Sequence, residues 1–146
     1  MFLFDVYASS RADELAPVPW TQEQKWAFLA QQFHAQDTDY HGRYPDADFS
    51  VIERDGVPAG RLYVARVGSG GINIVDIGLL PEHRGAGIGT ALVSDIIATA
   101  DREGVIVSLH VEQWNPARRL YRRLGFVEVT SNEVYIRMER RPDIVS

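Results

Sequence analysis

The feature that most constrains this chain is a glycine-rich stretch between two apolar segments. Residues 84–89 read Arg-Gly-Ala-Gly-Ile-Gly, after an apolar segment over residues 72–80 and before apolar residues at helical spacing over residues 90–100. The order strand, glycine turn, helix leaves free backbone N–H groups at a helix N-terminus, where the helix dipole favours an anion. Because glycine has no Cβ, the backbone can approach a ligand closely there. We therefore predict a phosphate or pyrophosphate site.

The spacing of the glycines separates the possible phosphate ligands. A dinucleotide fingerprint needs G-x-G-x-x-G, but Thr90 stands where its third glycine is required. A nucleoside-triphosphate loop needs a lysine after its last glycine, and this stretch contains no lysine. Counted from Arg84, the pattern is R-x-x-G-x-G.

Two motifs resemble signatures of the GNAT superfamily of N-acetyltransferases. The stretch from Leu79 to Gly89 is similar to the acetyl-coenzyme A motif of that family. Residues 115–126, Asn-Pro-Ala-Arg-Arg-Leu-Tyr-Arg-Arg-Leu-Gly-Phe, resemble its N-x-x-A-x-x-L-Y-x-x-L-G-F helix, although the alanine comes one place early. The two motifs follow each other in the family's order and at its separation, and together they cover roughly the second half of the chain.

Length and composition agree with one domain over residues 1–146, which is long enough to bury a sizeable core. No apolar run reaches the roughly 18–20 residues of a membrane span, and the N-terminus lacks the basic region of a signal peptide. The absence of cysteine excludes a disulfide, a thiolate metal site and a cysteine nucleophile. We expect a cytoplasmic protein with neither a metal nor a membrane partner. The net charge of −5 argues against a nucleic-acid partner.

The hydrophobic pattern predicts the order of the elements. Alternating apolar residues indicate a first strand over residues 2–7, and Ser9 or Ser10 caps a short helix that ends at Leu15. A capping-box pattern at Thr21 and Gln24 starts a helix over about residues 22–36, and a loop follows over residues 37–48. Further strands are predicted over residues 49–54, 61–67, 72–80, 105–111, 126–129 and 134–138, with a hairpin turn at Asp55-Gly56, a helix from about residue 88 to a C-cap at Gly104, and a helix over residues 116–124.

This order matches the GNAT fold, and the resemblance implies an α/β domain of mixed α+β type. Its central mixed sheet is expected to have about six to seven strands, with about four helices. The sheet is expected to splay apart between the fourth and fifth strands, predicted here over residues 72–80 and 105–111. By resemblance, acetyl-coenzyme A lies in this gap, and a backbone N–H of the splayed strand polarises the acetyl carbonyl.

The resemblance also implies how the coenzyme is held. Backbone groups near Leu79 and Leu80 pair with the pantetheine arm like an extra strand, and Asn115 binds that arm or a water. Asn115 is equally an ordinary N-cap before Pro116, and the two roles are compatible. The expected coenzyme-binding residues are Leu79, Leu80, Arg84, Gly85, Ala86, Gly87, Ile88, Gly89, Thr90, Asn115 and Tyr121.

The chemistry follows from the acceptor. A primary amine is protonated at neutral pH, so the enzyme must accept a proton from it and give one to the leaving thiolate. Without cysteine, direct attack on the thioester is the simple route. Tyr121 occupies the family's general-acid position near the coenzyme sulfur, and its alternative role is that of a core aromatic beside Leu120 and Leu124.

The predicted general base is His110 or Asp76. His110 has a suitable pKa and stands where some relatives that acetylate protein N-termini carry a glutamate. Asp76 lies among aliphatic residues of the other splayed strand, so it needs a partner or faces the cleft. Regular alternation of side chains along the strand places Asp76 on the same face of the sheet as Ile74, unless the strand contains a bulge. A structural hydrogen bond is the alternative for both residues, and Glu112 lines the acceptor side or lies in a solvated turn.

The sequence therefore predicts transfer of the acetyl group from acetyl-CoA to an amine of a small molecule or a protein N-terminus. The alternative is a non-catalytic acyl-CoA-binding sensor or interaction module. The four arginines between residues 118 and 123 form two short faces rather than a nucleic-acid surface, and one of them could reach the 3′-phosphate of the coenzyme. Dimers are common in the family, so a homodimer is an open expectation.

Overall fold

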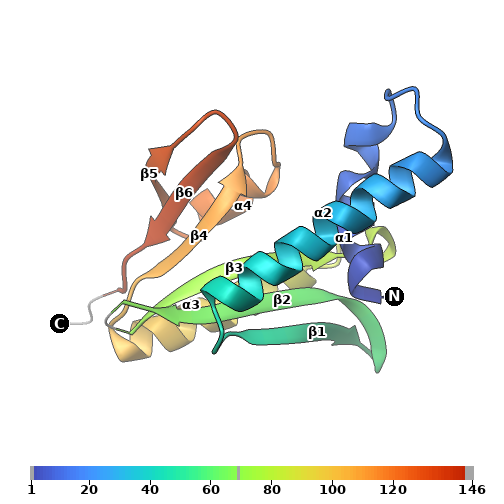
Figure 1. Ribbon diagram of the computed structural model, residues 1–146. Helices are drawn as coiled ribbons and strands as arrows, with labels where there is room; N and C mark the ends of the chain where they lie inside the picture. The colour runs from blue at the N-terminus through green and yellow to red at the C-terminus, as the bar shows by residue number, and fades with distance from the viewer. Residues whose placement is uncertain (1, 69, 144–146) are drawn as a thin grey trace.

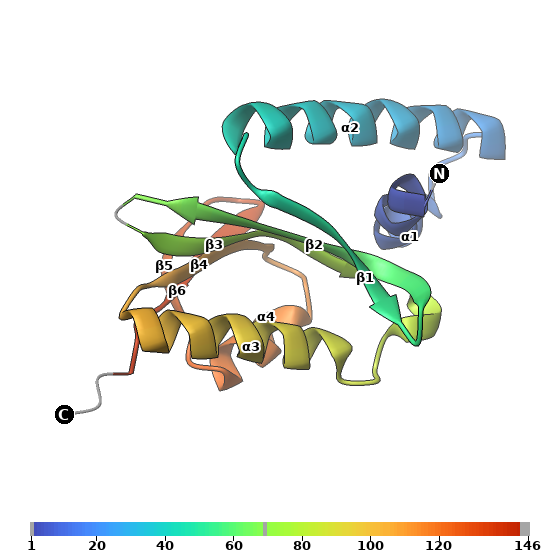
Figure 2. The ribbon, with the colours of Figure 1, turned by 90° about the horizontal axis from the view of Figure 1, so that it is seen from below.

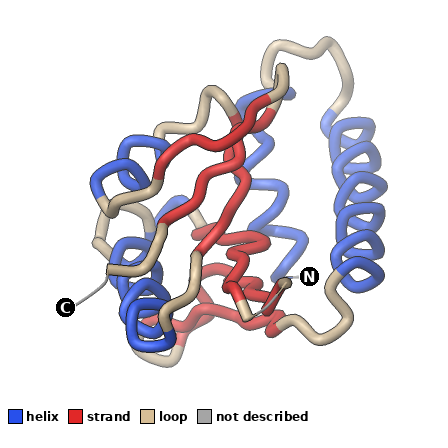
Figure 3. The backbone as a smooth tube through the Cα atoms, turned by 90° about the vertical axis from the view of Figure 1, so that its left-hand side faces the viewer, coloured by secondary structure: helices blue, strands red, loops and turns tan. Residues whose placement is uncertain are grey.

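The computed structural model describes residues 2–68 and 70–143, which build a six-stranded sheet with helices on both faces (Figure 1). The helices α1 and α2 cover one face of the sheet, and α3 and α4 cover the other (Figure 2, Figure 3). The predicted mixed α/β fold is confirmed. In chain order the elements are α1 (Phe2–Leu15), α2 (Gln22–Arg43), β1 (Asp48–Arg54), β2 (Val57–Val67), β3 (Gly71–Leu79), a 3-10 turn (Pro81–His83), α3 (Ile88–Glu103), β4 (Val107–Glu112), α4 (Ala117–Arg123), β5 (Val127–Ser131) and β6 (Tyr135–Arg140).

The sheet has the strand order β1-β2-β3-β4-β6-β5, and only β3 and β4 run parallel. These two strands pair over just three residues each, Ile72–Ile74 with Val107–Leu109. Beyond that point they diverge, as Figure 1 shows. The predicted splay between the strand before the glycine loop and the strand after its helix is therefore confirmed.

Local capping and turn signals were reliable guides to the ends of elements. The Thr21 hydroxyl accepts the Gln24 N–H at 3.1 Å, and the Gln24 side chain accepts the Thr21 N–H at 2.9 Å, which completes the predicted capping box. Asp55 and Gly56 both have positive φ, 52° and 79°, as a type I′ hairpin turn requires. Gly104 ends α3 in the left-handed conformation.

The prediction of a first strand over residues 2–7 is wrong, because this segment is the start of helix α1. Its apolar residues satisfy a helical period as well as an alternating one. Phe4 and Tyr7 pack on Phe33 of α2, while Val6 contacts the backbone of β3 at Gly78. Burial against two partners on different sides favours the helix over an edge strand.

The loop predicted over residues 37–48 is also wrong in its first half, since α2 continues to Arg43. Two ion pairs at helical spacing support the added turns: Asp37 with His41 at 3.3 Å, and Asp39 with Arg43 at 3.1 Å. The Tyr40 hydroxyl also donates to Asp76 on β3 at 3.1 Å. These contacts offset the weak helix propensity of the polar residues in this stretch.

Two separate hydrophobic clusters hold the layers together. The larger lies between the sheet and helices α3 and α4, and the smaller lies between α1 and α2. Buried residues of the larger cluster are Ile72, Ile74, Val93, Ile97, Ala100, Val107, Leu109, Val111, Tyr121, Phe126, Ile136 and Met138; those of the smaller are Tyr7, Ala8, Leu29 and Phe33.

Gly60 on β2 is required by close backbone packing. A Cβ at this position would lie 2.1 Å from the carbonyl oxygen of Gly78 and 3.0 Å from the Cα of Leu79. We expect Gly60→Ala to lower the free energy of unfolding by about 2 kcal/mol, because backbone atoms of a paired strand must move. Urea denaturation measures the change.

Gly42→Ala is the control for this prediction. Gly42 lies in α2, and a Cβ there meets no atom within 4 Å. The same substitution should therefore raise the free energy of unfolding by about 0.5–1 kcal/mol, the ordinary gain of alanine over glycine in a helix. Equal effects of the two substitutions would contradict the packing argument.

Candidate functional site

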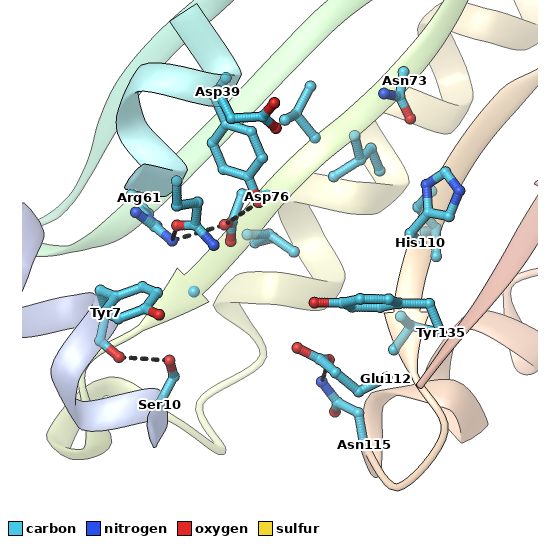
Figure 4. A pocket seen from close by; sticks show the side chains of 18 of the residues that line it. Tyr7, Ser10, Asp39, Arg61, Asn73, Asp76, His110, Glu112, Asn115 and Tyr135 are labelled. Atoms are coloured by element: carbon cyan, nitrogen blue, oxygen red, sulfur yellow. Dashed lines mark hydrogen bonds and ion pairs between the residues drawn. The ribbon is translucent and has the colours of Figure 1, made fainter. Parts of the chain in front are cut away.

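A cavity of about 390 Å³ lies where β3 and β4 separate, under the C-terminal half of α2 (Figure 4). Its walls come from α1, α2, β2, β3, β4, α4 and β6. Tyr121 lines it from α4, on the opposite face of the sheet from α2. The cavity therefore reaches through the gap between the strands. Five of the six tyrosines of the chain line it, namely Tyr7, Tyr40, Tyr44, Tyr121 and Tyr135.

A bulge in β3 turns Asp76 towards this cavity. Tyr63 of β2 pairs with Asp76 and the next residue, Val64, pairs with Ile74, so Val75 is skipped. Ile74 remains in the core on the α3 side, while Asp76 contacts Tyr40 on the α2 side. Simple alternation would have placed Asp76 with Ile74, and the extra residue reverses this.

The Asp76 carboxylate is held by two residues of two other elements, Arg61 of β2 and Tyr40 of α2. Arg61 of β2 donates to it at 2.7 Å and also donates to Gln36 of α2 at 2.7 Å. Arg61 is buried, and its guanidinium lies near the rings of Tyr7 and Tyr63. Burial raises the pKa of Asp76, although Arg61 and the Tyr40 hydroxyl act in the opposite direction.

This network limits what Asp76 can do. Burial, followed by the charge of Asp76, raises the pKa of Tyr40, so the phenol stays protonated and remains a donor. Although burial raises the pKa of Asp76, its carboxylate already accepts hydrogen bonds from Arg61 and Tyr40 and is held within the protein by them. The arrangement favours a structural role for Asp76, which was one of the two alternatives for this residue.

His110 faces the cavity from β4 and is exposed. Burial of part of the ring lowers its pKa below the ordinary value of 6.5, and the charges of Arg137 and Arg43 lower it further. The imidazole is therefore neutral at pH 7 and can accept a proton. Of the two predicted bases, His110 has the more suitable surroundings.

Glu112 and Asn115 form a pair at the end of β4. The Asn115 Nδ2 donates to Glu112 at 3.0 Å, and its Oδ1 accepts the N–H of Ala117 at 2.9 Å. Asn115 thus makes the cap-type hydrogen bond expected at the start of α4 and also fixes Glu112. Glu112 lines the cavity, which agrees with the first of its two predicted positions, the acceptor side, and not with a solvated turn.

Tyr121 is buried and packs edge-on against Phe126, with ring centroids 5.7 Å apart. Burial, helped by Asp76 and Glu112, raises the pKa of its hydroxyl to about 12. The phenol is therefore protonated throughout the physiological range and can donate. Tyr121 belongs to the core cluster and also lines the cavity.

The glycine loop presents a row of backbone donors. The N–H groups of residues 85–90 have no backbone acceptor among residues 2–68 and 70–143. Gly85 and Gly87 have φ of 77° and 80°, conformations that residues with a Cβ rarely adopt. The row lies at the N-terminus of the 16-residue helix α3, where the dipole adds to the attraction for an anion.

The flanking residues fix this loop to the rest of the molecule. Arg84 Nε donates to the carbonyl of Leu79 at 3.0 Å, and its Nη2 lies 3.5 Å from the Ser9 hydroxyl of α1. Leu80 donates its N–H to Ala59 of β2 at 2.8 Å. Backbone groups near Leu79 and Leu80 were predicted to pair with the pantetheine arm; of these groups, the Leu79 carbonyl and the Leu80 N–H have protein partners here.

Several residues of the site escaped the sequence analysis. Arg61, Arg11, Tyr7 and Tyr135 all line the cavity. Both Tyr7 and Arg11 lie on α1, where residues 2–7 were wrongly predicted as a strand and the part that contains Arg11 was predicted as a short helix. Arg61 had one detectable signal: it is one of two arginines in a mainly apolar strand, and a buried charge needs an ionic partner.

The basic helix α4 is largely neutralised on one side. Arg118 contacts Glu128 at 2.9 Å, and Arg122 forms an ion pair with the same carboxylate. Arg119 and Arg123 are exposed. These two are the α4 arginines left to contact the coenzyme.

Taken together, a mixed sheet splayed at its centre and a helix N-terminus with free donors define the class of coenzyme A-dependent acyltransferases. The sequence matches the "Acetyltransferase (GNAT) family" over residues 6–126, and the chain belongs to this family. The predictions of the GNAT fold and of an acetyltransferase are confirmed at the level of the family.

One curated relative and two solved structures illustrate the similarity. The chain is 35% identical over 80 residues to the GCN5-like protein acetyltransferase Rv2170 of Mycobacterium tuberculosis, a match covering 53% of this chain and 38% of that protein. The chain thus spans less than half of that relative. The PaiA N-acetyltransferase of Thermoplasma acidophilum in complex with coenzyme A has a TM-score of 0.69 at 16% identity, covering 96% of this chain and 91% of that one. The ribosomal-protein-S18-alanine N-acetyltransferase of Escherichia coli has a TM-score of 0.60 at 20% identity, covering 96% and 88%.

Two further findings hold for residues 2–68 and 70–143. None of the helices there is long and apolar enough to cross a membrane. No group of three or more His, Asp or Glu side chains in that part of the chain is arranged to hold a metal ion.

Proposed function

We propose that this protein transfers the acetyl group of acetyl-CoA to a primary amine, on a small molecule or at a protein N-terminus. The observation that carries the proposal is the row of free N–H groups over residues 85–90, at the end of the splayed strand. Six adjacent donors at a helix N-terminus suit a diphosphate. A diphosphate held there supports a position of the thioester near the cavity that Tyr121 and His110 line.

The proton transfers are divided between two residues. His110, neutral at pH 7, takes the proton that the amine must lose when its nitrogen bonds to the acetyl carbon. Tyr121, protonated at pH 7, gives its proton to the thiolate that leaves when the carbon–sulfur bond breaks. Bound acetyl-CoA supplies the acetyl group.

The test of the proposal is a panel of amines assayed by the release of free coenzyme thiol. The panel should include aliphatic amines, amino acids and peptides with different N-terminal residues. Thiol release with at least one class supports the transferase. Binding of coenzyme A without thiol release from any amine would support the sensor, and no binding at all would contradict both.

The pH dependence of turnover tests the role of His110. Its lowered pKa means that the neutral, active form is lost only as the pH falls below about 6.5. We expect kcat to show an acid limb with its midpoint under this pH. In His110→Gln the limb should disappear and kcat should fall about tenfold, because water in the exposed cleft replaces the base only partly.

Asp76→Asn separates the two predicted bases. Because the Asp76 carboxylate is engaged by Arg61 and Tyr40, this variant should keep the acid limb of the wild type. A profile that loses the limb in Asp76→Asn but keeps it in His110→Gln would assign the base to Asp76.

A further inference from the structure

Three carboxylates line the cavity, and two of them are neutralised by close arginines. Asp76 lies 2.7 Å from Arg61, and Asp39 lies 3.1 Å from Arg43. Both distances are those of charge-assisted hydrogen bonds. The third carboxylate, Glu112, has its cationic contact at 3.8 Å, which is too long for a hydrogen bond.

Glu112 is well placed to meet an acceptor. It is two residues beyond His110 on β4, so both side chains lie on the cavity face, about 7 Å apart along the strand. Tyr135 of β6 is its register partner, and Figure 4 shows the Tyr135 ring and the Glu112 carboxylate entering the same part of the cavity. A carboxylate beside an aromatic ring is a suitable site for an ammonium group. Asn115 holds the carboxylate in place at 3.0 Å.

The cation near Glu112 is Arg11 of α1. Within the described residues, not every N–H group of its guanidinium has a hydrogen-bond acceptor. Its Nη2 makes the 3.8 Å contact with Glu112, while its Nη1 donates to Glu14 of the same helix at 3.2 Å. Its Nε is buried and has no hydrogen-bond acceptor within the described residues. A guanidinium so placed can leave Glu112 without losing a hydrogen bond, since Glu14 remains as its partner.

We propose that Glu112 binds the ammonium group of the acceptor, and that Arg11 occupies this carboxylate only while the acceptor is absent. The acceptor is accordingly an amine that enters the cavity as a cation. It exchanges with Arg11 at Glu112 and lies along β4 towards His110. On becoming an amide the ammonium group loses two protons: the first passes to solvent before attack, and the second passes to His110 as the nitrogen bonds to the acetyl carbon. This inference rests on the proposed function, because it concerns the acceptor of the same reaction.

Glu112→Gln is the first test. Glutamine keeps the length of the side chain and an oxygen for Asn115, so the fold should be retained, which thermal melting checks. We expect the KM for the best amine of the panel to rise about tenfold, because a charged hydrogen bond is lost. The dissociation constant for coenzyme A should not change. The control is Glu53→Gln on β1, exposed and outside the cavity, which removes the same charge and should leave the KM unchanged.

Arg11→Met gives the decisive comparison, because the inference and a purely structural ion pair predict opposite signs. If Arg11 competes with the acceptor, its removal should lower the KM for the amine about threefold or more. If Glu112 and Arg11 merely hold α1 against β4, both substitutions should raise the KM together, and the inference would be wrong.

A binding measurement covers the case in which Glu112→Gln does not fold. For Arg11→Met and for the wild type, the dissociation constant of the best amine can then be compared with that of the alcohol of the same carbon skeleton. Under the inference Arg11→Met binds the amine more tightly but not the alcohol. Equal changes for both compounds overturn it. Failure of the wild type to acetylate any amine would instead overturn the proposed function, so the two failures are distinguishable.

Discussion

Replacing Gly89 with leucine is expected to weaken coenzyme A binding by at least about a hundredfold while leaving the fold slightly more stable. Gly89 lies in the first turn of α3 without a positive φ, and a Cβ there would meet no protein atom within 4 Å. The protein alone therefore gives no reason for glycine at this position. Leucine should raise the free energy of unfolding by about 0.5–1 kcal/mol through its helix propensity. The proposed diphosphate on the loop amides would account for the missing side chain.

The matched control is Gly42→Leu, since Gly42 also lies in a helix with open space around it. It should give a similar gain in stability with unchanged coenzyme binding. Isothermal titration with coenzyme A and urea denaturation measure the two quantities. Gly85 and Gly87 cannot serve here, because their positive φ would strain any other residue. Full coenzyme affinity in Gly89→Leu would show that the diphosphate does not lie on this loop.

Tyr121→Phe is expected to lower kcat about a hundredfold with little change in coenzyme affinity or stability. The hydroxyl is lost while the ring, which packs on Phe126, is kept. Because the pKa of Tyr121 is about 12, the wild type should lose no activity through its ionisation between pH 6 and 9. Steady-state kinetics with saturating acetyl-CoA gives the comparison.

The outcome that would exclude Tyr121 from the reaction is an unchanged kcat in this variant. A parallel loss of stability would point instead to a structural role of the hydroxyl. The melting temperature of the variant, measured alongside, separates the two cases.

The part of the fold from the first hairpin onwards could be predicted because its signals are local. The glycine loop, the Asp55-Gly56 hairpin and the Gly104 cap each require a backbone conformation that few other residues adopt. The first half carries no such signal over residues 2–7. There, apolar residues fit two periods, and only the packing of α1 on α2 and on Gly78 decides between them.

Residues that line the site could be predicted from the sequence, but the directions of their side chains could not. His110 and Tyr121 fall at motif positions, and both line the cavity. The direction of Asp76 depends on the bulge at Val75, and no residue type in that segment announces it. The Arg61–Asp76 pair and the approach of Arg11 to Glu112 join segments distant in sequence, so a linear pattern does not contain them.

The separation of the two hydrophobic clusters has a consequence for how such a chain diversifies. The residues packed between α1 and α2 share no member with the cluster that supports the glycine loop and the splayed strands. Side chains packed between α1 and α2 can therefore change without direct loss of packing in the larger cluster. Under the proposed function, this would allow the acceptor side of the cavity to vary while the packing behind the glycine loop is kept.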